Sequence, residues 1–372
     1  MYGFNSFYVH LYICYILYVT LVCCCFKQLK YKKNKIVLLG LPLVFLSSLR
    51  GDTVGGDLEN YLPNFDAYYY INNLKDLLGY NSHEPGYVLF TKLISLLYPS
   101  HRFYLIVTSI CTLIGPFYLI YKYSKMPGLS FLIYYSLGFY TNTMNNIRQS
   151  LAISICCFAI PFLFKREFRQ FVFIVLLATV FHYSAFTFIF IGLFHYVNFS
   201  LKKICAIYVV NFAVYHILGL KVLTYIMAFS LFKYDMDNLM QSTSGGTLFV
   251  FYSIILFIEL FIYKRNKAKM SLGQLKFFEF FIYLQLMATI FQLYAPIYSS
   301  ITRMTLYFYI PIILSIPFII ESFYKSSKGV AILGVQFMCV LYMCFFVYSY
   351  NKEANSNSQG VIPYIFIDEK MY

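Results

Sequence analysis

The sequence predicts an all-α, polytopic integral membrane protein with about twelve transmembrane helices and one re-entrant or interfacial segment. Three observations predict this fold class. Of the 372 residues, 60% are hydrophobic and only 12% are charged, which is about half the charge that a soluble protein carries. Apolar runs long enough to cross a bilayer recur along the chain, and Lys and Arg cluster between them. We therefore expect one polytopic membrane domain over residues 1–372.

The positive charge is a signal of topology. The formal net charge of +14 would suggest nucleic-acid binding in a soluble protein. Here the cations occupy short clusters between apolar runs, as they do in cytoplasmic loops and in contacts with anionic lipid. We expect membrane lipid as a partner and no nucleic acid. The ten Cys lie in or beside apolar stretches, without a CxxC pair, so neither a disulfide framework nor a zinc site is expected.

The N-terminal part is predicted to cross the membrane twice before a long outer loop. Tyr8–Phe26 is the first span, and it lacks the basic start and cleavage site of a signal peptide. The dense lysine run at 27–35 places the next connection in the cytoplasm and the N-terminus outside. Ile36–Leu49 is the second span. The segment 50–86 then forms an extracytoplasmic loop that is rich in acidic residues.

The remaining segments alternate across the membrane. Tyr87–Tyr98 is too short for a comfortable span and contains Lys92, so we expect it to be re-entrant or interfacial. With that assignment the later basic clusters fall on the cytoplasmic side. The later predicted spans are Phe103–Tyr121, Leu129–Tyr140, Ile147–Phe164, Phe171–Phe181, Tyr183–Val197, Ile204–Leu220, Leu248–Tyr263, Phe277–Pro296, Met304–Phe323 and Val330–Tyr348.

A polar turn, Met144–Gln149, is the strongest candidate for a functional site. It places Arg148 at a membrane boundary, where a charge is costly and usually has a function. Asn145 and Asn146 precede this arginine, and Gln149 follows it. At the start of a helix, amide donors and a guanidinium beside the positive end of the helix dipole suit phosphate or diphosphate. The alternative is a helix cap with an arginine that reaches the lipid interface.

An upstream segment is predicted to lie on the same outer side. Arg50 begins the segment 50–57, which contains three glycines, and glycine lets backbone N–H groups approach an anion closely. The alternative for Arg50 is an anchor to lipid phosphate. Asp52 and Asp57 could accept a proton from a sugar hydroxyl, hydrogen-bond a sugar, or pair with Arg50.

Two downstream residues also fall at the outer ends of predicted helices. His182 is the tip of a hairpin between apolar spans. It is either a hydrogen-bonded structural residue or, with its near-neutral pKa, a base that takes a proton from an attacking hydroxyl. Arg303 lies between a serine turn and the next helix. It could supply a second anion contact, or it could anchor that helix to lipid.

These residues resemble the EpsG family of bacterial exopolysaccharide polymerases, which are Wzy-like. The matching pieces span nearly the whole chain: Arg50 with Val54-Gly55-Gly56-Asp57 and Tyr61; Glu84-Pro85-Gly86-Tyr87; Met144-Asn145-Asn146-Ile147-Arg148-Gln149 with Ala152; Phe181-His182-Tyr183-Ser184-Ala185; Arg303; and Ile362-Pro363-Tyr364. One departure is Gly56, where the Val-Gly-x-Asp pattern is expected to carry threonine or another side chain.

The resemblance implies a multi-pass protein of the bacterial cytoplasmic membrane with an active site that faces outside. It would transfer a growing glycan from undecaprenyl diphosphate to the next lipid-linked repeat unit of a capsule, exopolysaccharide or O-antigen. Arg148 and Arg303 would bind the diphosphate with help from Arg50, and His182, Asp57 or Glu84 would act as base or sugar contact. We expect no metal and no cofactor. A flippase and a chain-length regulator of the same pathway are the expected protein partners.

Three other functions share parts of this pattern. An O-antigen ligase uses a similar donor, but is expected to have a large outer loop late in the chain, where 221–246 is modest. A flippase or transporter of lipid-linked sugars would carry its charges at mid-depth along several helices. A membrane O-acyltransferase would place its histidine near the cytoplasmic side.

Overall fold

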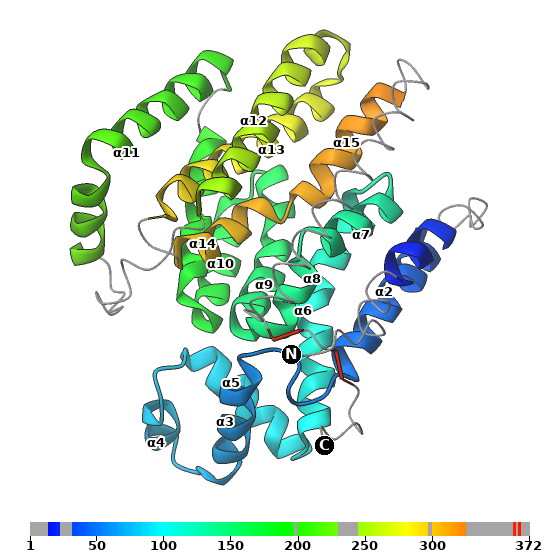
Figure 1. Ribbon diagram of the computed structural model, residues 1–372, viewed down its shortest axis with the longest axis vertical. Helices are drawn as coiled ribbons and strands as arrows, with labels where there is room; N and C mark the ends of the chain where they lie inside the picture. Colours follow the sequence, from blue (N-terminus) through cyan, green and yellow to red (C-terminus); the bar gives the residue numbers. More distant parts are fainter. Residues whose placement is uncertain are drawn as a thin grey trace, which may run out of the picture. The chain divides into compact units, whose positions relative to one another are not determined.

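Helices joined by short turns make up most of the described chain. The computed structural model describes residues 14–22, 32–196, 199–229, 245–296, 300–324, 360–361 and 364–365. Residues 14–22 are helical. The elements that follow are α2 (Lys32–Ser48), α3 (Leu58–Tyr70), α4 (Leu74–Gly79), α5 (Pro85–Leu97), α6 (His101–Tyr123), α7 (Pro127–Ser136), α8 (Phe139–Asn145), α9 (Ile147–Phe164), α10 (Phe168–Phe181), η1 (Tyr183–Tyr196), α11 (Leu201–Phe229), α12 (Gly245–Asn266), η3 (Lys267–Lys269), α13 (Leu272–Tyr294), α14 (Ser300–Tyr309) and α15 (Ile312–Tyr324) (Figure 1).

Within the described ranges, six helices are long and apolar enough to cross a membrane. They are His101–Tyr123, Ile147–Phe164, Leu201–Leu218, Gly246–Lys269, Leu272–Tyr294 and Ile301–Glu321. The helical, multi-pass character of the chain is therefore confirmed, whereas the predicted count of about twelve spans is not. The predicted span at 330–348 lies outside the described residues, as does part of the first one.

Several predicted segments differ in detail from the observed helices. In place of one span at Leu129–Tyr140, α7 and α8 are separated at Gly138, whose φ of 76° lies in the left-handed region that glycine adopts readily. The loop 50–86 contains α3 and α4. The short apolar segment after it is α5, whose 13 residues extend about 20 Å, less than the roughly 30 Å of bilayer hydrocarbon.

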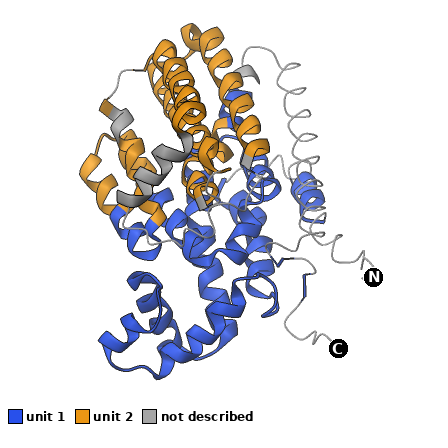
Figure 2. Ribbon diagram, turned by 60° about the vertical axis from the view of Figure 1, so that its left-hand side comes forward, with its two compact units in different colours: residues 1–158, 176–183, 316–372 blue, residues 159–175, 184–315 orange. Residues whose placement is uncertain are grey.

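The chain divides into two compact units, which Figure 2 colours separately. Unit 1 comprises residues 1–158, 176–183 and 316–372, and unit 2 comprises residues 159–175 and 184–315. In unit 1, α2 packs against α6 and α7, and α3 packs against α5. In unit 2, α13 packs against α12 and α14. A capping box begins α13, because Ser271 and Gln274 satisfy each other's backbone N–H groups.

A close contact between α6 and α9 depends on Gly115. The Ser154 hydroxyl accepts a hydrogen bond from the Gly115 N–H at 3.0 Å and donates one to the Cys111 carbonyl at 2.6 Å. It therefore joins two backbone groups of the neighbouring helix. A Cβ at Gly115 would lie 2.2 Å from the backbone oxygen of Ser154. Small residues allow such approaches in membrane proteins, where packing and hydrogen bonds hold helices together.

Replacing Gly115 with alanine should therefore destabilise unit 1. The added methyl group must push α6 from α9, and overpacking of this kind costs about 1–3 kcal/mol. Thermal unfolding of the purified protein in detergent measures the effect. Gly79→Ala is the matched control, because a Cβ there meets nothing within 4 Å. Equal melting temperatures for the two variants would contradict this account of the helix contact.

Candidate functional site

A single carboxylate, that of Glu84, joins two of the predicted site residues. Its Oε2 accepts a hydrogen bond from Arg148 Nη1 at 2.6 Å, and its Oε1 accepts one from His182 Nδ1 at 2.7 Å. The Tyr183 N–H also donates to Oε1, at 3.4 Å. The Glu84 side chain is 3% exposed, against 25% for Arg148 and 12% for His182. These residues all belong to unit 1, and we call Arg148, Glu84 and His182 the charged triad.

Local sequence explains how Glu84 reaches both partners. It occupies the N-cap position of α5, with Pro85 in the first turn, and its side chain makes no capping hydrogen bond. The carboxylate is thus available to other elements. A Cβ at Gly86 would lie 2.8 Å from the Val180 carbonyl oxygen, so only glycine allows α5 to come this close to the end of α10. That approach places Glu84 beside His182, which directly follows α10.

Arg148 is the second residue of α9, and aromatic rings surround it. Its Cζ lies 5.9 Å from the centre of the Tyr61 ring and 6.0 Å from that of Tyr87, within the range of cation–π attraction. Its Nε lies 3.5 Å from the Tyr61 hydroxyl. The hydroxyls of Tyr87 and Tyr104 are 2.7 Å apart. The guanidinium is therefore held by one charge and two rings.

Burial, hydrogen bonds and neighbouring charges shift the pKa values of Glu84 and of its neighbour His83. Burial alone would raise the pKa of Glu84, but the hydrogen bond and charge of His182 and the charge of Arg148 lower this pKa to about 2. Burial, and then the charge of Arg148, lower the pKa of His83 to about 4. At physiological pH, Glu84 is therefore a carboxylate and His83 is neutral.

The glycine-rich segment 50–57 contacts the polar turn before α9. The Asp57 N–H donates to Asn145 Oδ1 at 2.9 Å, and Asp57 is the N-cap residue of α3. Gly55 has φ of 108°, and a Cβ there would lie 2.4 Å from the Met144 carbonyl oxygen. Gly55 N–H also donates to the Gly360 carbonyl at 2.8 Å, so residues near the C-terminus lie against this segment.

Other predicted substrate contacts have protein partners in this structure. Arg50 is 1% exposed, and its Nη1 donates to Ser47 Oγ at 2.9 Å. Asp52 is exposed and lies 3.4 Å from His101 Nδ1. Their roles in substrate binding stay predictions, and the positions of both side chains are explained without a ligand.

Two amides of the polar turn and Arg303 complete the predicted set. Asn146 Nδ2 donates to Asn142 Oδ1 at 2.7 Å, and Gln149 is buried at 2% exposure. Arg303 is an exposed residue of α14 in unit 2. Its proposed convergence with Arg148 therefore stays a prediction.

Sequence reasoning did not assign Tyr61 and Tyr87 to the site. Both accompany predicted site residues at helical spacing, since Tyr61 follows Asp57 by four positions and Tyr87 follows Glu84 by three. Residues three or four apart share a helix face. This spacing could have indicated that both tyrosines belong to the site. In a chain with 39 tyrosines, however, it does not distinguish these two from the others.

The triad contains the chemical groups that proton transfer beside an anion requires. Because ionised Glu84 can only accept hydrogen bonds, His182 Nδ1 must donate, and Nε2 is left to accept a proton. A histidine oriented by a carboxylate is a common form of general base. The described residues contain no group of three or more His, Cys, Asp or Glu side chains that could hold a metal ion. One Asp-x-Asp pair, Asp235 and Asp237, falls in residues 230–244, outside the described ranges.

Comparison with known proteins gives one match. The model of the EpsG family matches residues 33–366, nearly the whole chain. Neither a curated protein nor a solved structure matches the chain.

The charged triad predicts a characteristic loss of stability in acid. The pKa of Glu84 is lowered from 4.5 to about 2, so its carboxylate stabilises the folded state fully above pH 4.5, and this contribution disappears as the pH falls towards 2. The difference corresponds to about 3 kcal/mol. Denaturant unfolding in detergent between neutral pH and pH 2 measures it. Glu84→Gln should be less stable at neutral pH and lose this part of the pH dependence. Glu59→Gln, which removes an exposed carboxylate, is the control, and an identical profile for both variants would refute the assignment.

Proposed function

The chain belongs to the EpsG family and is a membrane protein of polysaccharide biosynthesis, and on this basis we propose that it is a glycan polymerase. It would transfer a growing chain from undecaprenyl diphosphate to a hydroxyl of the next lipid-linked repeat unit. The reaction would take place at the outer face of the bacterial cytoplasmic membrane. The observation that supports the proposal is the triad, in which Glu84 holds a partly exposed Arg148 and His182.

The proposed transfer needs a cation for the leaving group and a base for the acceptor. A bond forms between the acceptor oxygen and the anomeric carbon, and the bond from that carbon to the diphosphate oxygen breaks. Undecaprenyl diphosphate leaves with the electron pair, and Arg148 stabilises its charge. The acceptor hydroxyl proton passes to His182 Nε2. A fixed guanidinium and an oriented imidazole are sufficient for both tasks.

Among the predicted bases, the geometry favours His182. Glu84 has both carboxylate oxygens hydrogen-bonded, and with a pKa of about 2 it is a weak base at neutral pH. We therefore assign Glu84 a positioning role. Asp57 contacts Asn145 through its backbone and is the second candidate base. Arg303 and Arg50 remain the proposed additional contacts with the diphosphate.

Arg148→Ala should abolish long polymer in cells while leaving single-repeat products. Arg148→Lys should restore little, because a lysine cannot bind Glu84 and a phosphate through one planar group. Gel electrophoresis of extracted polysaccharide from cells with equal amounts of each protein measures chain length. Lys75→Ala removes an exposed cation of α4 and is the matched control. Normal chain length from a well-expressed Arg148→Ala protein would exclude the proposed role.

The same experiment separates bond formation from transport. A defective polymerase leaves single repeats attached to surface lipid, whereas a defective flippase leaves no repeats outside the cell. His182→Gln extends the test to the base, because glutamine can keep the hydrogen bond to Glu84 but cannot take up the proton. We expect polymer formation to fall by about 10²–10⁴-fold. Normal activity of the His182→Gln protein would exclude His182 as the base and would favour Asp57 in that role.

A further inference from the structure

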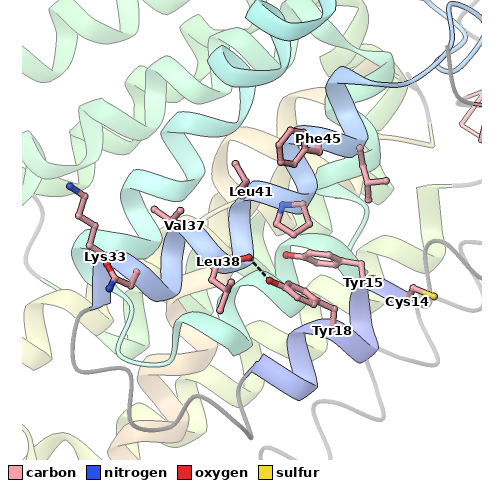
Figure 3. Close-up of a pocket in the computed structure, with 11 residues that line it drawn as sticks. Cys14, Tyr15, Tyr18, Lys33, Val37, Leu38, Leu41 and Phe45 are labelled. Atoms are coloured by element: carbon pink, nitrogen blue, oxygen red, sulfur yellow. Dashed lines mark hydrogen bonds between the residues drawn. The ribbon is translucent and has the colours of Figure 1, made fainter.

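A cavity of about 640 Å³ lies between the helix at residues 14–22 and α2, a volume typical of sites for small molecules. Figure 3 shows its lining. Val37, Leu41 and Phe45 project from α2 along the cavity, and Lys33 lies at one end. Asn34, the next residue in the sequence, also lines the cavity. The lining is thus apolar over most of its length and has a cation at one end. We call this cavity the N-terminal groove.

Two tyrosine hydroxyls of the helix at residues 14–22 donate hydrogen bonds to backbone carbonyls of α2. Pro42 has no N–H, so the carbonyl of Leu38, four residues earlier, lacks its usual helical partner. The Tyr18 hydroxyl donates to this carbonyl at 2.8 Å. Tyr15 similarly donates to the Leu39 carbonyl, at 2.9 Å. Such pairing is needed in a bilayer, where water is absent, and it fixes the two walls of the groove.

The length of the groove suits a single hydrocarbon chain. Val37, Leu41 and Phe45 recur every four residues and are 53%, 47% and 54% exposed, so they form one continuous apolar face on α2. From Lys33 to Phe45 this face extends about 18 Å along the helix axis. One leaflet of bilayer hydrocarbon is about 15 Å thick. A lipid chain could therefore lie along the groove from end to end.

The polar end of the groove carries a positive charge, that of Lys33. Lys32 and Lys35 belong to the same first turn of α2 but do not line the groove. Lys32 Nζ lies 6.0 Å from the centre of the Tyr121 ring of α6, so Lys33 is the cation of this turn that the headgroup would meet in the groove. Each lysine near the membrane surface contributes about 1 kcal/mol to the attraction of anionic lipid. This end of the groove therefore matches a phosphate headgroup in charge.

We propose that the N-terminal groove holds one hydrocarbon chain of an anionic bilayer phospholipid, with the phosphate headgroup at Lys33 and Asn34. The headgroup would lie at the start of α2, about 22 Å from the end of the helix at Ser48. The segment that contacts Asn145 begins only after that distant end. The occupant is thus a lipid of the surrounding membrane and not the glycan donor, and the proposal is independent of the polymerase reaction.

The chain contains no tryptophan, so one introduced tryptophan can report which lipid occupies the groove. Phe45→Trp places the probe in the apolar part, and Val37→Trp gives a second probe nearer to Lys33. The full chain is reconstituted in phosphatidylcholine nanodiscs that contain a small fraction of phosphatidylglycerol or phosphatidylcholine brominated in the acyl chains. Brominated phosphatidylglycerol should give half-maximal quenching at about a fifth of the mole fraction needed with brominated phosphatidylcholine. Added salt should reduce this preference.

Two matched controls connect the result to the groove. Ile114→Trp places the probe at a 51% exposed position of α6 outside the lining residues and should show no preference between the two lipids. In the Phe45→Trp protein, Lys33→Gln should remove the preference. Lys122→Gln, which removes a cation that does not line the groove, should preserve it.

Three results would overturn the proposal. Equal quenching by the two brominated lipids at both probes would show that the groove has no preference for anionic lipid. Weak quenching by both would show that protein fills it. Loss of quenching when undecaprenyl diphosphate is added at the concentration of the brominated lipid would identify the carrier lipid as the occupant.

Discussion

The paired hydrogen bonds of Glu84 to Arg148 and His182, at 2.6 and 2.7 Å, are the interaction on which the candidate site depends. Neither Arg148 nor His182 is bound through its ionic or ring nitrogens by a residue close to it in sequence, so without this carboxylate each would have to find another hydrogen-bond partner. Removing one member of a buried ion pair usually costs about 3–5 kcal/mol, since it leaves an uncompensated charge. Glu84 must therefore be ionised for the site to keep its geometry.

Close backbone approaches bring the separate segments to this carboxylate. Gly86 allows α5 to meet the end of α10, and Gly55 allows the segment after α2 to meet Met144. Gly360 has φ of 63°, and a Cβ at Gly360 would lie 2.6 Å from the backbone nitrogen of Gly56. A side chain at any of these positions would separate elements that carry site residues. The glycine at position 56, which departs from the expected pattern, thus has a packing partner.

Sequence patterns predicted the helical membrane architecture, because hydropathy and charge clusters record the contact of each segment with lipid or water. They also indicated Asp57, Arg148 and His182 as candidate site residues, and the roles of these residues stay predictions. They could not show that Glu84 joins the last two, since these partners lie 64 and 98 positions away and no local spacing records such a contact. Likewise, hydropathy treated 129–140 as continuous, because it does not detect the reversal of φ at Gly138.

The central claim, that ionised Glu84 fixes His182 through its Nδ1 proton, can be tested by nitrogen NMR of the histidine-labelled protein in lipid. The His182 resonances are assigned as those missing from His182→Gln. We expect a protonated Nδ1 in a strong hydrogen bond, and a clear change of its chemical shift in Glu84→Gln. An unprotonated Nδ1, or a His182 spectrum that Glu84→Gln leaves unchanged, would contradict it.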